Sequence, residues 1–223
     1  MKEEKYKRTK IGKLEPEERK KNFNEVVLGY NEDEAIEEAK RCIQCKKPLC
    51  VEACPIKQDI PNYCKLLGEG NFDDALEVII KSNPIPGICG RICVKFCETK
   101  CILGKKGEPI AIAWLKRAAA DFGKAEVKIE KYNGRKIAII GSGPAGLSCA
   151  YFLAREGYDV KIFEKASRAG GMLSTVIPEY RLPIKVVEKE IEFLKKLGIK
   201  IETNKKISDI SSLLSTNDAL FIC

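Results

Sequence analysis

The hydrophobic positions in the first half of the chain repeat at helical spacing, and capping residues mark where helices begin. Asn31 precedes an acidic first turn and an apolar-periodic stretch that ends at Cys42, and Asn71 precedes a similar stretch with Asp73 and Asp74 in its first turn. Asparagine satisfies free backbone N–H groups at a helix start, and acidic residues complement the positive end of the helix dipole. The pattern predicts helices over residues 31–42, 60–67, 71–81 and 110–122, with a turn over 104–107.

The second half alternates short apolar runs with helical stretches. A buried strand over residues 136–140 leads into a glycine-rich turn, and a helix and a second strand follow over 147–156 and 160–163. Parallel strands joined by crossover helices have this order. We further expect a helix over 188–197 and strands over 199–202 and 218–223.

The change of pattern divides the chain into four parts. Residues 1–22, dominated by Lys, Arg and Glu, are expected to form a mobile or loosely docked arm. Pro84, Pro86 and Gly87 are expected to break the chain within the helical part. The predicted fold class is α + α/β, an all-helical domain followed by an incomplete Rossmann-like domain. The helical domain covers residues 23–123, a polar linker 124–134 and the Rossmann-like domain 135–223.

Two blocks of cysteines give the helical part its candidate chemistry. Nine of the eleven cysteines lie between residues 42 and 101, and eight of these have regular spacing. Cubane iron–sulfur clusters each take four thiolate ligands, so eight cysteines suffice for two clusters. In the ferredoxin-like arrangement, the cysteine before proline ligates the other cluster, so we expect interleaved clusters. The candidate metal ligands are Cys42, Cys45, Cys50 and Cys54 in the first block, and Cys89, Cys93, Cys97 and Cys101 in the second.

Other roles for the cysteines are weaker alternatives. Disulfides are disfavoured because the sequence shows no secretory signal. Structural zinc is the serious alternative, but zinc motifs usually pair C-x2-C with a second C-x2-C or with histidines, and the chain has no histidine. Cys64, Cys149 and Cys223 fall outside the spacing, and we expect them to be small buried apolar residues.

The glycine-rich turn after residues 136–140 carries a dinucleotide fingerprint. Gly141 allows a tight turn, Gly143 lets a pyrophosphate approach the backbone, and Gly146 lets the helix pack close to the strand. The helix N-terminus then offers free N–H groups to the phosphates. Glu164 ends the second strand, where it is placed to accept hydrogen bonds from ribose hydroxyls. The alternative is a tight glycine turn in an unrelated α/β domain. The full turn is Gly141, Ser142, Gly143, Pro144, Ala145 and Gly146.

A second glycine pair follows the second strand, in the run Gly170-Gly171-Met172-Leu173. Flavoproteins of this type bring such a pair against the cofactor, whereas a domain that binds only a nicotinamide nucleotide does not need it. We therefore expect FAD in preference to NAD. No general acid or nucleophile is required by this chemistry.

Charge and composition exclude some partners. The formal net charge is +8, but two oxidised clusters at about −2 each and a pyrophosphate at about −2 would leave about +2. The lysines are also interspersed with glutamates, so nucleic acid is disfavoured. The chain is 44% hydrophobic and 32% charged, as ordinary soluble proteins are. It shows no apolar run long enough to span a membrane and no signal peptide.

Together these motifs resemble the small (β) subunit of NADPH-dependent glutamate synthase. The module also occurs in ferredoxin:NADP electron-bifurcating subunits and in the N-terminal part of dihydropyrimidine dehydrogenase. The resemblance implies that NADPH reduces FAD and that electrons pass through two [4Fe–4S] clusters to a partner. It adds Lys165 and Arg181 to the cofactor-binding residues. Its motifs are the cysteine blocks, Gly104-Lys-Lys-Gly-Glu-Pro-Ile-Ala-Ile112, the glycine turn, Phe163-Glu-Lys165, the second glycine pair and Ile177-Pro-Glu-Tyr-Arg-Leu-Pro183.

The resemblance also implies a division of the ligands. Cys42, Cys45, Cys50 and Cys101 would hold one cluster, and Cys54, Cys93 and Cys97 the other. Relatives often place a Glu or Gln ligand about where Lys116 stands, and an ammonium group does not ligate iron, so Cys89 is the candidate fourth ligand.

The chain shows no second glycine fingerprint for NADPH, so we expect a C-terminally truncated fragment, or half of a split protein, whose NADPH site lies elsewhere. The expected electron acceptor is a large catalytic subunit or fused redox domain of the glutamate synthase α type, in the cytoplasm. The alternatives are a non-catalytic iron–sulfur adaptor and a zinc-stabilised nucleotide-binding module.

Overall fold

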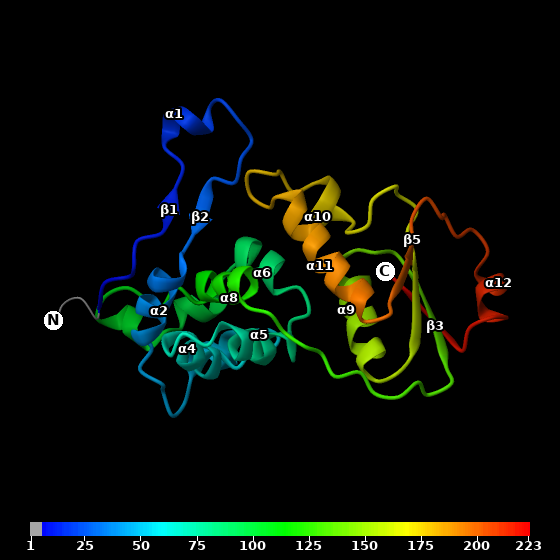
Figure 1. The fold of residues 1–223 in the computed structure, drawn as a ribbon, viewed down its shortest axis with the longest axis horizontal. Coiled ribbons are helices and arrows are strands. Elements are labelled where there is room, and N and C mark those ends of the chain that lie inside the picture. Colours follow the sequence, from blue (N-terminus) through cyan, green and yellow to red (C-terminus); the bar gives the residue numbers. More distant parts are fainter. Residues whose placement is uncertain (1–5) are drawn as a thin grey trace. The chain divides into compact units, whose positions relative to one another are not determined.

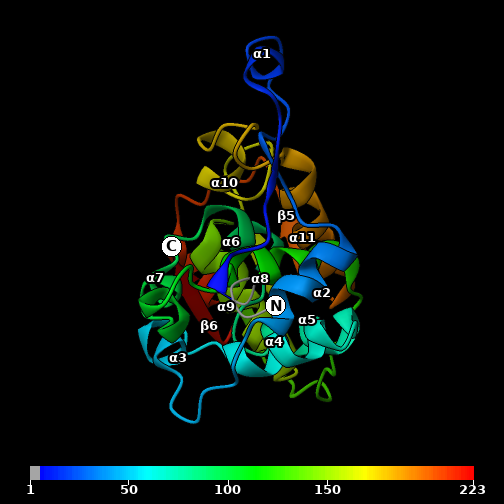
Figure 2. The same cartoon turned by 90° about the vertical axis from the view of Figure 1, so that its left-hand side faces the viewer.

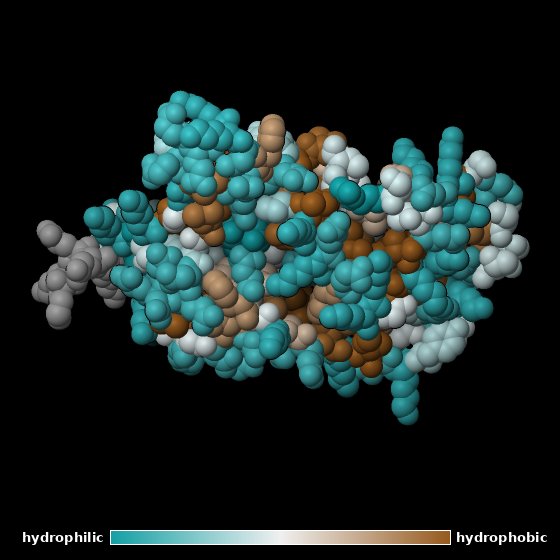
Figure 3. Space-filling view, turned by 45° about the horizontal axis from the view of Figure 1, so that its top comes forward, coloured by the Kyte–Doolittle hydropathy of each residue, from teal (hydrophilic) through white to brown (hydrophobic). Residues whose placement is uncertain are grey.

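The computed structural model describes residues 6–223, which fold as two units that divide after Glu126 (Figure 1). This division falls within the segment 124–134 that the sequence predicts as a linker. Hydrophilic residues cover most of the face shown in Figure 3. Within residues 6–223, no helix combines the length and the hydrophobicity needed to cross a membrane.

Unit 1 is built from short helices and one hairpin. Strands β1 and β2 pair antiparallel, and α1 lies in the loop between them (Figure 1). Helices α3 and α7 pack side by side (Figure 2). The elements are β1 (Gly12–Lys13), α1 (Pro16–Arg19), β2 (Val27–Gly29), α2 (Glu32–Lys40), α3 (Leu49–Ala53), α4 (Ile60–Gly68), α5 (Phe72–Ile80), α6 (Pro86–Ile92), α7 (Phe96–Thr99), the 3-10 helix η2 (Ile102–Lys105) and α8 (Ile112–Phe122).

Helix α8 is the centre of unit 1. It packs against α2, α4, α5 and α6, and residues 112–120 are all buried. A helix that is buried on every side needs neighbours around its whole circumference, and these four helices supply them. Fully buried Tyr63 of α4 donates a hydrogen bond from its hydroxyl to the carbonyl of Ile112 at 3.3 Å. Two cysteine-bearing helices, α4 and α6, therefore pack directly against α8.

Two buried carboxylates cap the N-terminus of α8. Glu38 of α2 accepts from the N–H of Ala111 at 2.7 Å, and Glu98 of α7 accepts from the N–H of Ala113 at 3.0 Å. Ala111, at the N-cap position, has no side chain that could cap the helix. The negative charges also complement the positive end of the helix dipole. The two glutamates thus fix the ends of two cysteine-bearing segments to one helix.

Two arginines balance these carboxylates. Arg41 forms a 2.6 Å ion pair with Glu38, and Arg8 forms a 2.9 Å ion pair with Glu98. The backbone N–H of Thr9 also donates to Glu38 at 2.8 Å. These contacts tie residues 8 and 9 of the predicted arm to unit 1, while residues 1–5 of that arm lie outside the described residues.

The β-hairpin is held by a second buried ion-pair network. Arg117 of α8 donates to the carbonyls of Val27 and Leu28, each at 2.7 Å, and pairs with Glu25 at 2.8 Å. Arg91 of α6 pairs with Glu25 at 2.9 Å and shares Asp121 with Arg117. Both guanidinium groups are buried, so the acidic partners offset the cost of removing them from water.

Unit 2 is a parallel sheet with helices that connect its strands (Figure 1). The strand order is β5-β4-β3-β6. The chain adds β4 and β5 on one side of β3 and then places β6 on the other side, so the order switches between β3 and β6. Such a switch point opens a crevice at the carboxyl ends of the strands, where open α/β sheets bind their ligands. The elements are β3 (Lys136–Ile140), α9 (Pro144–Arg155), β4 (Asp159–Phe163), α10 (Met172–Thr175), α11 (Ile184–Lys196), β5 (Lys200–Glu202), α12 (Ile210–Leu214) and β6 (Ala219–Ile222).

The elements expected from the sequence are confirmed, with differences at their ends. Asn31 and Asn71 cap α2 and α5 as predicted, and Asn31 forms a full capping box with Glu34. The expected chain break is confirmed at Pro84, which lies between α5 and α6, but it is wrong for Pro86 and Gly87, because α6 begins at Pro86. Proline is favoured at the first helical position, since its missing N–H would have no partner within the helix and its φ is already helical.

Candidate functional site

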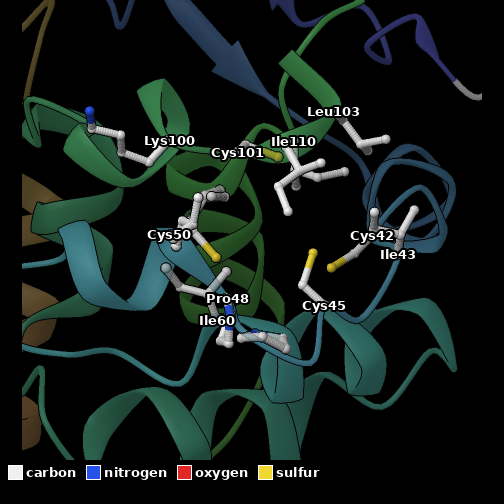
Figure 4. Close-up of a pocket in the computed structure, with 14 residues that line it drawn as sticks. Cys42, Ile43, Cys45, Pro48, Cys50, Ile60, Lys100, Cys101, Leu103 and Ile110 are labelled. Carbon is white, nitrogen blue, oxygen red and sulfur yellow. The ribbon is translucent and has the colours of Figure 1, made fainter. Parts of the chain in front are cut away.

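The first candidate site in unit 1 gathers four cysteines from three segments. Cys42 follows α2, and Cys45 follows Gln44, whose φ of 51° turns the chain back. Cys50 lies in α3, and Cys101 immediately precedes η2. In Figure 4 the four sulfur atoms point into the same space. Apolar side chains line the rest of that pocket, among them Ile60, Ile110 and Ile112. The structure thus brings together the four cysteines that the family resemblance assigns to one cluster.

The thiols of this group influence one another's protonation. The pKa of Cys50 is raised to about 11, first by burial and then by Cys101 and Cys42. Burial is also the main reason that the pKa of Cys45 is raised, and Cys42 and Cys101 add to it. Thiolates grouped in this way repel one another, and a bound metal centre would neutralise them. The donor set and the apolar walls therefore fit an iron–sulfur cluster.

The second candidate group lies between α3, α6 and α7. Cys54 ends α3, Cys93 ends α6, and Cys97 lies in α7. The pKa of Cys97 is raised to about 12, mainly by burial, and Cys54 and Cys93 both contribute. Cys89 lies one helical turn before Cys93 on α6 and is half-buried.

Lys116 of α8 is buried next to this second group, with 6% of its surface exposed. Its charge lowers the pKa of Cys97 and so opposes the effect of burial. An ammonium group in this place favours a thiolate without ligating a metal.

The cysteines of the two groups are not placed to ligate a single metal ion. Among residues 6–223, no three Cys, Asp or Glu side chains come together as ligands of one metal ion. A cubane binds each thiolate at its own iron, so its ligands surround a larger body than one ion.

Cys64 is a functional candidate that the sequence analysis missed. We expected a small buried apolar residue, and its side chain is indeed fully buried. Its thiol, however, interacts with that of Cys42, and this interaction is the main reason that the pKa of Cys42 falls to about 7. Cys64 lies in α4, outside the regular cysteine spacing, so spacing gave no sign of this contact.

Replacement of Cys64 by alanine is expected to weaken metal retention by about 10–100-fold, the usual cost of losing an outer-shell partner of a metal ligand. Competition with an iron chelator under anaerobic conditions measures this change. Cys149→Ala, in unit 2, is the control. Equal retention in the two variants would contradict the role of Cys64.

In unit 2, the glycine turn has the geometry that a nucleotide site requires. Gly141 has φ +106°, and a Cβ there would strike the carbonyl oxygen of Cys223. A Cβ on Gly146 would strike the carbonyl oxygen of Gly141. A Cβ on Gly143, in contrast, would meet no atom within 4 Å. Gly143 thus leaves open space at the N-terminus of α9, where Pro144 and Ala145 form the exposed first turn.

Glu164 is engaged with the glycine turn itself. Its Oε2 accepts from the N–H of Ser142 at 2.9 Å and from the Ser142 hydroxyl, and its Oε1 accepts from the N–H of Ala166 at 2.8 Å. Burial alone would raise the pKa of Glu164, but these hydrogen bonds outweigh it and hold the pKa below its usual value. A carboxylate has about four acceptor positions. The three hydrogen bonds occupy two of these positions on Oε2 and one on Oε1.

The second glycine pair lies against the first turn. Gly171 has φ +55°, and a Cβ there would lie 3.0 Å from the Cα of Gly143. The N–H of Gly170 donates to the Ser142 hydroxyl at 3.0 Å. The structure therefore brings together the two glycine motifs, Ser142 and Glu164.

The remaining predicted cofactor-binding residues of unit 2 differ in their exposure to solvent. Leu173 is buried, whereas the side chains of Lys165, Met172 and Arg181 are exposed. The expectation of a buried Cys223 is wrong: it is exposed at the end of β6, with its sulfur 3.4 Å from the carbonyl oxygens of Ile140 and Gly141. Cys223 lies opposite the glycine turn because β6 pairs with β3. The residues around Cys223 in the sequence do not indicate this pairing.

Comparison with family models identifies both units. Residues 19–128 match the model described as dihydropyrimidine dehydrogenase domain II, 4Fe-4S cluster. Residues 139–189 match an NAD(P)-binding Rossmann-like domain. The predicted α + α/β fold class is confirmed.

Several curated proteins are similar along most of the chain. The glutamate synthase [NADPH] small chain of Escherichia coli K12 is 34% identical over 92% of this chain and 45% of its own length. That of Bacillus subtilis strain 168 is 34% identical over 97% of this chain and 48% of its own. The NADP(+)-dependent formate dehydrogenase subunit beta of Moorella thermoacetica is 38% identical over 78% of this chain and 29% of its own. The chain thus spans about half the length of the first two relatives.

Proposed function

The chain belongs to the glutamate synthase small-chain family, and from this premise we propose that it is the electron-transfer module of an NAD(P)H-dependent flavin and iron–sulfur oxidoreductase. The observation that carries the proposal is the convergence of Cys42, Cys45, Cys50 and Cys101 on one apolar pocket. These thiols come from three separate segments, and a structural role alone would not require them to converge.

In the proposed arrangement, Cys42, Cys45, Cys50 and Cys101 hold one [4Fe–4S] cluster. The second is held by Cys54, Cys93 and Cys97, with Cys89 as the fourth ligand. Bound FAD would supply two-electron hydride chemistry, and bound clusters would supply one-electron transfer. The apolar side chains of the pocket exclude water from the first cluster, and the Lys116 ammonium offsets negative charge at the second.

The proposed FAD site uses the switch point of unit 2. The first turn of α9 directs its N–H groups at the pyrophosphate, and Gly143 leaves room for its approach. Glu164 holds Ser142 and keeps one acceptor position for the ribose. Gly170, Gly171, Met172, Leu173, Lys165 and Arg181 complete the proposed flavin side.

The electron acceptor is proposed to be a large partner subunit or a fused redox domain. The names of the E. coli and B. subtilis relatives describe them as chains of NADPH glutamate synthases. We propose a cytoplasmic location, since eleven cysteines in a chain that forms no disulfide suit a reducing compartment.

A reductive titration tests this function. Protein purified without oxygen is expected to take up about four electrons per chain, two at the flavin and one at each cluster. Dithionite titration followed by absorbance and electron paramagnetic resonance counts them. Uptake of about two electrons, without a cluster signal, would contradict the module.

Replacement of Gly143 by alanine is expected to remove bound flavin without unfolding unit 2. The added methyl group meets no protein atom within 4 Å, but it occupies the space proposed for the pyrophosphate. Flavin content and thermal unfolding, measured on the same sample, separate the two effects. Full flavin content in the variant would contradict the proposed site.

A further inference from the structure

An exposed apolar patch borders the first cysteine pocket. Ile43, Leu49 and Ile102 are 43%, 39% and 37% exposed, and all three line that pocket. Each stands next to one of the pocket's cysteines in the sequence. Aliphatic side chains grouped on a surface mark contact sites more often than isolated ones do.

Five lysines lie in the two chain segments that carry this patch. Lys46 and Lys47 lie on the loop between Cys45 and Cys50, and Lys100, Lys105 and Lys106 flank Cys101 and η2. All five side chains are exposed. Residues 43–50 and 100–107 contain these five lysines and no acidic residue, and the exposed acid nearest in sequence to the first of these segments is Glu52.

These lysines are not paired with acidic side chains, although exposed Glu52 and Glu108 adjoin the two segments. Within residues 6–223, none of the five ammonium groups forms an ion pair or hydrogen bond. Other surface lysines do pair, as Lys161 does with Glu202 at 2.8 Å and Lys195 with Glu192 at 2.7 Å. In Figure 4 the Lys100 side chain extends away from the pocket. The positive charge is thus directed outward around the patch.

From this juxtaposition we propose that the patch and its lysines form the docking surface for a one-electron redox protein with an acidic surface. A partner seated there would approach the first cluster, separated from it by little more than the rim of the pocket. The exchange is one electron, lost by this chain and gained by the partner's oxidised centre. This inference rests on the proposed function and adds the kind of partner.

Charge complementarity is the reason for this choice of partner. Unpaired positive charge around a contact site raises the association rate of an acidic partner and makes that rate sensitive to salt. The central aliphatic side chains supply contact area that is removed from water. The two segments contain no aromatic residue on which nucleobases could stack.

Binding of flavodoxin, an acidic one-electron carrier, to the cluster-loaded chain tests the proposal. The triple variant Lys46→Glu, Lys47→Glu, Lys100→Glu is compared with Lys185→Glu, Lys196→Glu, Lys206→Glu, which has the same net charge and changes exposed lysines of unit 2. The first variant is expected to reduce the association rate by about tenfold or more, and the second much less. Cytochrome c, a basic carrier, is expected not to bind.

Three outcomes would overturn the docking surface: equal losses in both variants, no binding of flavodoxin even at low salt, or tighter binding of DNA or anionic vesicles at the same residues. Iron content is measured on every sample. Full iron with no flavodoxin binding rejects only the docking surface, whereas absence of iron in the unmodified chain rejects the proposed function itself.

Discussion

Replacement of Cys101 by serine is expected to halve the iron content, from about eight to about four atoms per chain, because one of two cubanes loses a ligand. Cys101 lines the pocket together with Cys42, Cys45 and Cys50, and the second group does not depend on it. Iron and acid-labile sulfide analysis on anaerobically purified protein measures the change. We also expect unit 1 to unfold at a lower temperature, since cluster ligation contributes to its folding.

The control for this variant is Cys149→Ser. Cys149 lies on α9 in unit 2 and belongs to neither cysteine group, so the iron content is expected to stay at about eight atoms. If both variants kept all their iron, Cys101 would not be a ligand. If Cys101→Ser lost all its iron, the clusters would not be independent.

Replacement of Glu38 by alanine is expected to lower the free energy of unfolding of unit 1 by about 3–5 kcal/mol, the cost of removing one partner of a buried ion pair. Glu38 is fully buried and accepts from Arg41, Thr9 and Ala111. Its loss removes the carboxylate that pairs with the Arg41 guanidinium and the acceptor of the Ala111 N–H, while Arg41 still donates to the carbonyl of Glu108 at 2.7 Å. Denaturant unfolding of the cluster-loaded chain measures the difference.

Glu37→Ala is the matched control, because Glu37 is the preceding residue of the same helix and is exposed. Its replacement is expected to change stability by less than about 0.5 kcal/mol. A loss as large as that of Glu38→Ala would mean that the effect comes from the helical propensity of α2 and not from the capping of α8.

The fold was predictable from sequence where local signals decide it. Asn31 and Asn71 mark helix starts because an N-cap acts on the backbone two or three residues away. The glycine turn was predictable for the same reason, since the positive φ of Gly141 and the close approach of Gly146 to the Gly141 carbonyl both arise within one strand–turn–helix unit. The prediction for Pro86 was wrong because proline can either end a helix or begin one. Tertiary packing, which local sequence does not show, decides which of these occurs.

Contacts across long sequence separations could not be predicted in this way. The interaction between Cys64 and Cys42 depends on how α4 packs beside α2. Glu98 caps α8 from fifteen residues away, and no local pattern marks a glutamate as the cap of a distant helix. Glu164 was expected to bind a ribose. In the structure it also accepts a hydrogen bond from Ser142, which lies twenty-two residues earlier in the chain.

We propose that this chain holds two cubane clusters and FAD. Analysis of iron, acid-labile sulfide, zinc and flavin on protein purified without oxygen tests it most directly. The account predicts about eight iron and eight sulfide per chain, with one FAD. Zinc in place of iron, or a chain with neither sulfide nor flavin, would contradict it.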